Sequence, residues 1–347
     1  MKIGKVPETV LNRSVLRPLL LAGAAGDSAV FGKDCAVFAV GNRETGSEAS
    51  TPRLAAAVVT GTLDGPFDRT LEMLLASVLL NLATEGARGE KVLLSLLLPE
   101  EEQEESLKRL MNQAGALCAR YQLTVEGGHT EVSSAIRRPV VTVTCLGALP
   151  REEGQRAEVA AKQGFEPRME LVMAGWTGAA GTAILAEGMK ERLLERFPFR
   201  MVEAARDLEM LRLLPEAARA RNHFGVSALH DVSQGGVFAA LWELAECAGA
   251  GLEVDLKKIP IRQETIEICE YFQINPYQLY GQGALLLGTY QGEELVTRLR
   301  ERSIEAAVIG TITGNRQRMI RNGEEIRYLD RPGQDELWRL ARQLEEE

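Results

Sequence analysis

Apolar residues recur along this chain with two spacings, and the two spacings alternate from segment to segment. Residues 91–98 form an almost continuous apolar run of strand length. Residues 100–122 are longer and open with three acidic residues, which suit the positive N-terminal end of a helix. This alternation of strand and helix patterns predicts a mixed α/β fold whose helices cover a face of a sheet.

The same reading extends over the rest of the chain. Strands are predicted at residues 35–40, 54–60, 91–98, 123–125, 139–149, 169–174, 252–256, 284–289 and 306–313. Helices are predicted at residues 7–17, 66–86, 100–122, 202–214, 215–223, 236–248, 293–302 and 335–345, and another opens at residues 178–182. Asn322-Gly323 predicts a two-residue hairpin turn between short strands.

Length and composition indicate two domains. A chain of 347 residues exceeds the size of most single hydrophobic cores. Residues 150–167 are charged and lack a clear period, so we place a boundary there. The expected domains are residues 1–150 and 151–347.

The charge balance disfavours a nucleic-acid partner. The chain has 40 basic and 49 acidic residues, a net charge of −9, whereas nucleic-acid binding needs a basic surface. An anionic nucleotide is still compatible with this balance, because a few converging backbone N–H groups can hold phosphate.

Cysteine usage and hydropathy point to a cytoplasmic protein without a membrane partner. No apolar run reaches membrane-spanning length, and the first residues lack the apolar core of a signal peptide. No two cysteines form a Cys-x-x-Cys pair, so we expect reduced thiols that mostly serve as small core residues. The five are Cys35, Cys118, Cys145, Cys247 and Cys269.

Two segments join a glycine pair to histidine and carboxylate residues. Residues 126–131 read Glu-Gly-Gly-His-Thr-Glu, and residues 230–236 read His-Asp-Val-Ser-Gln-Gly-Gly. Paired glycines permit close approach of a ligand or a positive φ, so each segment predicts a turn beside a phosphate or metal site. In the first, His129 could bind phosphate and Glu131 a metal; otherwise the segment is a tight turn with a satisfied histidine.

The second glycine pair precedes an apolar helix. Ser233 is placed to cap that helix, and the free N–H groups at its start would suit an anion. The alternative is ordinary helix capping without a ligand. The third histidine, His223, is expected to have a surface or core role.

Residues 23–37 are rich in glycine. They form either a phosphate-cradling loop that ends in a metal-binding carboxylate or a flexible connector with a capping aspartate. A short echo, Asp27-Ser28-Ala29-Val30-Phe31 and Asp34-Cys35-Ala36-Val37-Phe38, leaves the register of the carboxylate open between Asp27 and Asp34.

Taken in order, these segments resemble the aminoimidazole-ribonucleotide synthetase superfamily along nearly the whole chain. The nearest branch looks like the HypE-like hydrogenase-maturation proteins. The matching residues are Gly32-Lys33-Asp34-Cys35-Ala36-Val37, Asn81, Gly127-Gly128-His129-Thr130-Glu131, residues 178–185 and His230-Asp231-Val232-Ser233-Gln234-Gly235-Gly236.

The resemblance implies a PurM-like two-domain α/β architecture. It implies a homodimer whose N-terminal mixed sheets pair into a shared barrel, with ATP and Mg²⁺ bound between the domains. It further implies a phosphoryl-transfer or dehydration-type reaction, as in a ligase or kinase, on a small-molecule acceptor, and a maturation protein as partner.

The resemblance also assigns roles to residues. It implies catalytic roles for His129, His230 and Asp231. It implies nucleotide contacts by Gly32, Asp34, Asn81, Gly127, Gly128, Gly178, Gly235 and Gly236. It implies metal ligation by Asp34 and Glu131, with Asp64 as a replacement ligand.

Three departures from the family pattern change this picture. Gly61 and Leu82 stand where the family carries metal-binding aspartates, and Asp64 is close enough in sequence to replace the first. The last cysteine is Cys269, so the chain lacks the C-terminal cysteine that carries a carbamoyl group in HypE proteins. Because metal bridging supports phosphoryl transfer, two hypotheses follow. The protein is an ATP-using enzyme with an unidentified second substrate, or it is a catalytically degenerate nucleotide-binding dimer that serves as a sensor or partner.

Overall fold

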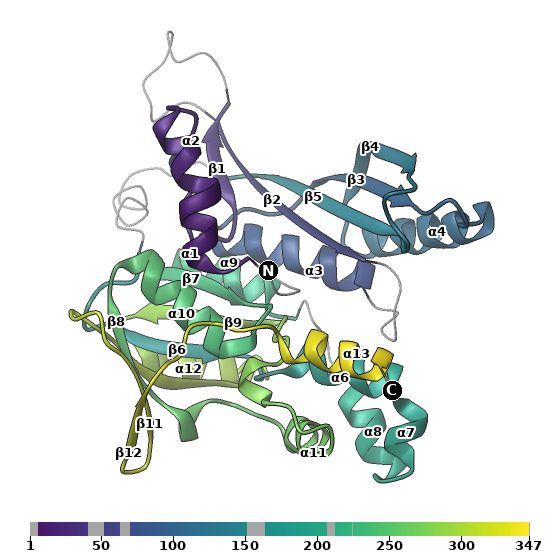
Figure 1. Ribbon diagram of the computed structural model, residues 1–347. Helices are drawn as coiled ribbons and strands as arrows, with labels where there is room; N and C mark the ends of the chain where they lie inside the picture. The colour runs from purple at the N-terminus through teal and green to yellow at the C-terminus, as the bar shows by residue number, and fades with distance from the viewer. Residues whose placement is uncertain are drawn as a thin grey trace. The chain divides into compact units, whose positions relative to one another are not determined.

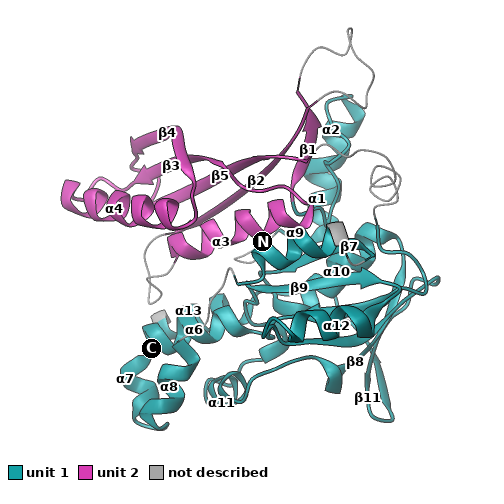
Figure 2. Cartoon of the chain, turned by 180° about the vertical axis from the view of Figure 1, so that it is seen from behind, with its two compact units in different colours: residues 1–34, 152–347 teal, residues 35–151 magenta. Residues whose placement is uncertain are grey.

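The computed structural model describes residues 6–40, 52–62, 70–150, 164–206, 212–223 and 225–346. The chain divides into two compact units (Figure 2). Unit 2 is Cys35–Arg151, and unit 1 combines Met1–Asp34 with Glu152–Glu347. The first 34 residues are therefore grouped with the C-terminal half, whereas we expected them in a domain of residues 1–150. Asp64 lies outside the described residues.

Unit 2 contains a five-stranded mixed sheet in the order β1-β2-β5-β3-β4. Its strands are β1 (Ala36–Ala39), β2 (Arg53–Thr62), β3 (Lys91–Leu98), β4 (Thr124–Val132) and β5 (Val140–Ala148). Its helices are α3 (Thr70–Thr84) and α4 (Glu104–Arg120). All strand pairs are antiparallel except β3 with β4, because the α4 crossover returns the chain in the same direction.

One face of this sheet is covered and the other is open (Figure 1). Alternate residues of β3 and β5, such as Val92 and Val143, are buried on the side that carries α3. Helix α3 is apolar on most of its circumference and is itself largely buried. The opposite face exposes large apolar side chains, among them Phe38, Val58 and Leu93, and Val58 is 63% exposed.

Strand β4 is longer than we predicted. We expected the strand to end at residue 125 and a turn to follow at the glycine pair, but β4 continues through Gly127 and Gly128 to Val132. Its register against β3 shifts between Val125 and Gly127, which leaves Glu126 as a bulge. Gly128 faces Leu94, and a Cβ on Gly128 would lie 1.7 Å from the Leu94 carbonyl oxygen. This glycine therefore permits close approach of two strands rather than a turn.

Unit 1 is built on a seven-stranded sheet in the order β12-β11-β8-β10-β6-β9-β7. The strands are β6 (Glu170–Ala174), β7 (Val226–Val232), β8 (Gly251–Asp255), β9 (Ala284–Thr289), β10 (Ala306–Thr313), β11 (Arg318–Asn322) and β12 (Glu325–Tyr328). Among the strand pairs of this sheet that the structure describes, β11 with β8 is parallel and the others are antiparallel. Strand β7 was not predicted.

Some helical segments of unit 1 pack on this sheet, and others pack on one another. The segments are α1 (Glu8–Leu11), a π-helical turn (Asn12–Leu16), α2 (Arg17–Leu21), α6 (Ala179–Gly188), α7 (Lys190–Leu194), α8 (Phe199–Arg206), α9 (Leu214–His223), α10 (Gly236–Ala248), α11 (Gln263–Tyr271), α12 (Gly292–Arg300) and α13 (Glu336–Glu346), with 3₁₀ turns at Leu256–Lys258 and Pro276–Gln278. Helix α10 supplies much of the core: Leu241 and Leu244 pack with sheet residues such as Leu171.

Most predicted elements are present, and the mixed α/β, two-domain PurM-like fold is confirmed. Strands β3, β9 and β10 and helix α10 have the bounds that the pattern predicted. The hairpin is displaced by one residue: Asn322 pairs with Glu325, so the turn is Gly323-Glu324. Four cysteines are buried, and Cys247 is exposed. None of the helices in the described ranges is both long and apolar enough to cross a bilayer.

Candidate functional site

His230 and Asp231 lie near the end of strand β7. Both side chains are buried, and His230 is only 3% exposed. The hydrophobic pattern did not predict this strand, because two ionisable residues interrupt its apolar run near the end. In the structure, β7 pairs with β9 and leads into α10 through Ser233 and Gln234. His230 and Asp231 therefore stand on a rigid strand end and not in a turn.

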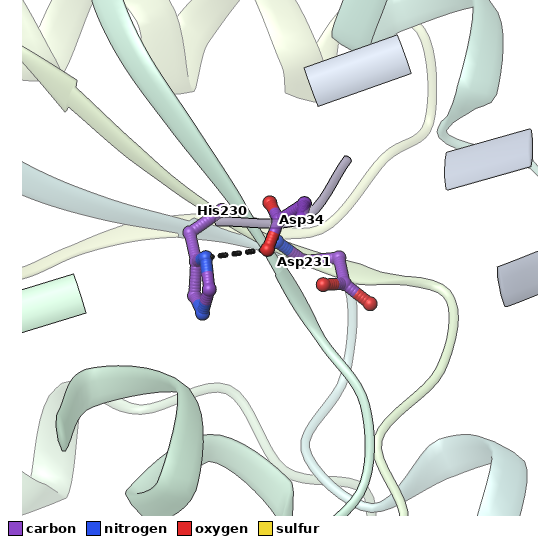
Figure 3. A group of neighbouring side chains, drawn as sticks. All are labelled: Asp34, His230 and Asp231. Carbon is purple, nitrogen blue, oxygen red and sulfur yellow. Dashed lines mark hydrogen bonds and ion pairs between the residues drawn. The ribbon is translucent and has the colours of Figure 1, made fainter. Parts of the chain in front are cut away.

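Asp34 reaches these residues from the glycine-rich segment (Figure 3). Its Oδ1 atom is 2.8 Å from Nδ1 of His230, and its Oδ2 atom accepts the backbone N–H of Asp231 at 3.3 Å. Asp34, His230 and Asp231 all belong to unit 1. Asp27 is exposed, so the structure brings Asp34 rather than Asp27 to the end of β7.

The glycine-rich segment is held against α10 by close packing. Gly32 has a φ of +81°, and a Cβ there would lie 2.7 Å from the carbonyl oxygen of Glu243. The neighbouring Phe31 packs on the core cluster. Only glycine permits this contact at the helix surface, and the contact fixes where Asp34 points.

His230 lies between two carboxylates. Its Nε2 atom is 3.4 Å from Oε2 of Glu243, at ion-pair distance, on the side away from Asp34. Burial acts to lower the pKa of His230, but the charges and hydrogen bonds of Asp34 and Glu243 outweigh burial and raise the pKa well above 6.5. The ring is therefore an imidazolium at neutral pH. It holds Asp34 in place and is not a free base.

The group formed by Asp34, His230 and Asp231 can be tested as a metal site. Ligand atoms of the three residues lie within 4.8 Å of one another. A hard cation such as Mg²⁺ prefers carboxylate oxygens, and a protonated imidazole does not ligate metal. In Figure 3 the Asp34 carboxylate is drawn between the His230 ring and the Asp231 carboxylate. The residues that fit Mg²⁺ are therefore the two aspartates.

The start of α10 differs from the prediction. Ser233 does not cap the helix with its side chain; its carbonyl oxygen accepts the Gly236 N–H. The Gly235 N–H donates instead to Oδ2 of Asp335, at 2.6 Å. A carboxylate of the chain itself therefore takes one of the N–H groups that we expected to suit an anion. Asp335 was missed as a site residue because an aspartate before a helix reads as an ordinary cap, which it also provides for the Leu337 N–H.

The glycines of unit 1 have packing roles at the starts of helices. Gly235 and Gly236 have φ values of +82° and +64°. A Cβ on Gly236 would lie 2.6 Å from the Tyr277 carbonyl oxygen. Gly178 precedes α6 in the left-handed region, and a Cβ there would lie 3.0 Å from the Pro276 carbonyl oxygen. The backbone comes this close only because these positions lack a side chain.

The remaining predicted site residues belong to unit 2. His129 and Glu131 are exposed on the edge strand β4, where His129 Nε2 is 3.1 Å from Glu131 Oε2. Gly127, on the same strand, has only Leu93 Cδ2 within 4 Å of the position of a Cβ, at 3.9 Å. These residues share the open face of the sheet, because they pair with residues of β3 that point to that face.

Asn81 and Leu82 are consecutive residues of helix α3, but their side chains have different surroundings. Leu82 is 0% exposed in the core, so its side chain does not reach a site. Asn81 is partly exposed, and its Oδ1 atom is buried without a hydrogen-bond partner. A buried carbonyl oxygen without a donor is an available ligand for a cation or a donor group.

Comparison with known families identifies both halves of the chain. The model of the AIR synthase related protein N-terminal domain matches residues 32–149. The model of the corresponding C-terminal domain matches residues 170–321. Together the two models cover the elements that carry Asp34, His129, His230 and Asp231.

Curated relatives share about a quarter of their residues with the chain. A putative hydrogenase expression/formation protein of Methanocaldococcus jannaschii is 24% identical over 237 residues, which is 67% of each protein. The phosphoribosylformylglycinamidine synthase subunit PurL of Methanopyrus kandleri is 24% identical over 207 residues. That match spans 58% of this chain and 27% of PurL, so the chain corresponds to about a quarter of that protein.

Solved structures share the fold. The structure of a HypE-HypF complex superposes with a TM-score of 0.69 at 15% identity, over 92% of this chain and all of the other. HypE in complex with ATP gives 0.66 at 18% identity, over 97% of each chain. AaThiL complexed with AMPPCP and TMP gives 0.66 at 18% identity, over 92% and 97%. With both halves matched in order and this fold throughout, the chain belongs to the family of AIR synthase related proteins and is HypE-like within it.

Proposed function

We propose that the protein binds ATP with Mg²⁺ and uses it to activate or phosphorylate a small substrate, in a step of metalloenzyme maturation of the hydrogenase type. The observation that carries this proposal is the placement of Asp34 over the His230-Asp231 strand end. Two sequence segments that are far apart build this group within one unit. Relatives with hydrogenase-formation names and a neighbour solved with ATP support the proposal.

The charge of the site suits a metal-bridged triphosphate. Asp34, Asp231 and Glu243 bring three carboxylates to one imidazolium, so the group is acidic at neutral pH. An acidic site repels a bare triphosphate but attracts a cation that the triphosphate also binds. Mg²⁺, when bound by Asp34 and Asp231, would neutralise charge on the phosphates. His230 would keep Asp34 oriented through its Nδ1–H.

Unit 2 supplies further proposed nucleotide contacts. His129 and Glu131 present accessible polar groups beside the small Gly127, which leaves room for a ligand at the strand edge. Asn81 contributes an amide oxygen without a donor. We propose that these residues contact the nucleotide.

The second substrate is not carried on the last cysteine of the chain. Cys269 is buried in α11, and burial raises the pKa of its thiol to about 12. A protonated, enclosed thiol is a poor nucleophile. We propose that the acceptor is a separate small molecule or a group that a partner protein delivers. The neighbour solved as a HypE-HypF complex supports a partner of the maturation type.

A homodimer is part of the proposal. The open face of the unit 2 sheet exposes Phe38, Val58 and Leu93, which lie on three of its five strands. Apolar side chains that project from adjacent strands form a surface suited to a second sheet. Pairing of two such faces would close a barrel between two copies of the chain.

Calorimetric titration of ATP into the purified protein, with MgCl₂ or with EDTA, tests the site. We expect binding that requires Mg²⁺ and that weakens roughly 10–100-fold in Asp34→Asn, because a carboxylate ligand is replaced. Asp27→Asn is the matched control, since Asp27 begins the same short sequence pattern and is exposed. Equal binding by wild type and Asp34→Asn, or no binding by wild type, would contradict the proposed site.

The absence of two metal-binding carboxylates favours a second candidate function, nucleotide binding without turnover. Leu82 lies in the core and Gly61 has no side chain, so two carboxylates of the family pattern are missing. A protein with a weakened metal site could bind nucleotide and act as a sensor or partner without turnover. Mg²⁺-dependent ATP hydrolysis that disappears in Asp34→Asn would exclude this alternative. Tight binding without hydrolysis, in the presence of candidate acceptors, would favour it.

A further inference from the structure

Unit 1 contains a small pocket apart from the Asp34–Asp231 group. Three segments enclose it: residues 6–9 at the start of the N-terminal helix, the first two turns of α10 and residues 331–335 before α13. Its volume is about 70 Å³, which is room for several water-sized groups. A ligand that fills it would be small.

The walls of the pocket are acidic. Glu8, Glu243 and Asp335 line it from three different segments. Arg331 is the one basic residue among the lining residues that the structure describes, and it is exposed. Carboxylates that converge on a partly enclosed space repel anions and favour a cation.

Asp335 is a buried carboxylate without a counter-charge. It is 4% exposed, and its oxygens accept backbone N–H groups, from Gly235 at 2.6 Å and from Leu337 at 2.8 Å. No lysine, arginine or histidine of the described residues lies within ion-pair distance of it. Burial raises its pKa to about 7 although these N–H groups oppose the shift. The charge of this group is therefore incompletely compensated in the pocket.

Aromatic rings complete the walls. Phe31 and Trp242 line the pocket, and Nε1–H of Trp242 donates to Oε2 of Glu8 at 3.0 Å. The guanidinium of Arg318 already lies 3.8 Å from the centre of the Trp242 ring. An aromatic face attracts organic cations through its negative quadrupole. Rings and carboxylates together favour an organic cation over an inorganic ion, which would need more oxygen ligands.

We propose that this pocket binds a small organic cation, through an ammonium or guanidinium group that donates to Asp335 and Glu8 beside Trp242. The ligand differs in charge from a nucleotide phosphate, so the pocket serves another molecule or another part of a substrate. The proposal does not depend on ATP binding. Glu243 lines the pocket and also pairs with His230. A cation bound in the pocket would therefore change the electrostatic environment of His230 and Asp34.

Titration of the full-length protein with ethylammonium chloride or methylguanidinium chloride tests the proposal. The measurements are tryptophan emission and thermal denaturation at constant ionic strength and pH 8, where Asp335 is ionised. We expect saturable binding with both readouts. Asp335→Asn should weaken it at least about tenfold, which corresponds to roughly 1.4 kcal/mol. Glu8→Gln, on the surface helix, should weaken it several-fold and serves if Asp335→Asn does not fold.

Glu336→Gln is the matched control, because Glu336 is the adjacent carboxylate but pairs with Arg339 outside the pocket. This variant should bind like wild type. N-acetyl-lysine methylamide and N-acetyl-arginine methylamide distinguish a free small molecule from a side chain of a partner. Tighter binding of these two compounds identifies a protein side chain as the source of the cation. Absence of saturation, an equal response to potassium chloride, or unchanged affinity in Asp335→Asn and Glu8→Gln would overturn the proposal.

Discussion

His230 has two carboxylates at its ring, Asp34 on Nδ1 and Glu243 on Nε2, and each comes from a different segment of the chain. The two carboxylates stabilise the charged form of the buried imidazole more than burial destabilises it, so the pKa of His230 is raised. Its main effect is therefore to fix Asp34 at the end of β7. The raised pKa makes His230 a weak candidate for a general base at this site.

The raised pKa of His230 has a defined effect on stability. A histidine whose pKa is higher in the folded state stabilises the protein fully below its unfolded pKa of about 6.5. That stabilisation is lost as the pH rises through the higher folded pKa. Glu243→Gln should move the NMR titration of His230 to lower pH and reduce the unfolding free energy at pH 7 by about 1–3 kcal/mol.

Glu246→Gln is a suitable control for this change. Glu246 lies on the same helix but pairs with Arg318, so its removal should leave the titration of His230 in place. An unchanged midpoint in Glu243→Gln would show that Asp34 alone sets the pKa.

Asp335 also predicts a loss of stability with rising pH, although here the folded state favours the neutral form of the group and not the charged one. Burial, partly offset by the N–H groups of Gly235, Leu337 and Tyr280 and assisted by the charge of Glu336, raises its pKa to about 7. The folded state then prefers the protonated form, so the contribution of this group to stability falls as the pH rises from about 4 to about 7. The loss is on the order of a few kcal/mol.

Urea unfolding at pH 5 and pH 8 measures this effect. Wild type should lose stability over this interval through Asp335, and Asp335→Asn should lose less, because an amide does not ionise. Glu336→Gln should keep most of the wild-type dependence, because burial raises the pKa of Asp335 more than the charge of Glu336 does. The same pH dependence in Asp335→Asn as in wild type would refute the assignment to Asp335.

At the scale of elements, the two glycines of β4 are adjacent in sequence but have different structural roles. Gly128 lies between strands, where a Cβ would meet the Leu94 carbonyl oxygen at 1.7 Å. Gly127 has its nearest atom at 3.9 Å from the position of a Cβ. One glycine is required by strand pairing, and the other leaves free space on the open face.

Alanine substitutions should therefore differ strongly. Gly128→Ala should lower the unfolding free energy by more than about 3 kcal/mol, because β3 and β4 must separate. Gly127→Ala should change it by less than about 1 kcal/mol. Thermal denaturation of the two variants checks this contrast. Similar melting temperatures would show that β4 does not pair with β3 in the observed register.

At the scale of the whole molecule, the proposed homodimer would pair through the open face of unit 2. Val58→Asp places a charge in the middle of that face and should convert a dimer into a monomer in sedimentation equilibrium. Ile326→Asp is the control, because Ile326 is a comparably exposed apolar residue on β12 of unit 1. A monomeric wild type, or dissociation by Ile326→Asp, would argue against pairing of these faces.

The order and type of most elements followed from the sequence alone. Residues 91–98 and 236–248 were predicted with their observed bounds, because strand and helix periods are local properties of a chain. The family resemblance, and with it the fold, also rested on short motifs that keep their order. Strand β7 was missed because its ionisable residues are tolerated only where Asp34 and Glu243 are close.

The tertiary structure alone decided which polar residues meet. Asp27 and Asp34 begin the same local pattern, and only the packing of Gly32 on α10 brings Asp34 to His230. Asp335 is about a hundred residues from Gly235, and no local period relates them. Hydrophobic spacing determines what each segment becomes, because it acts between near neighbours. The chemistry of the site depends on contacts between distant segments, which form only when the core has closed.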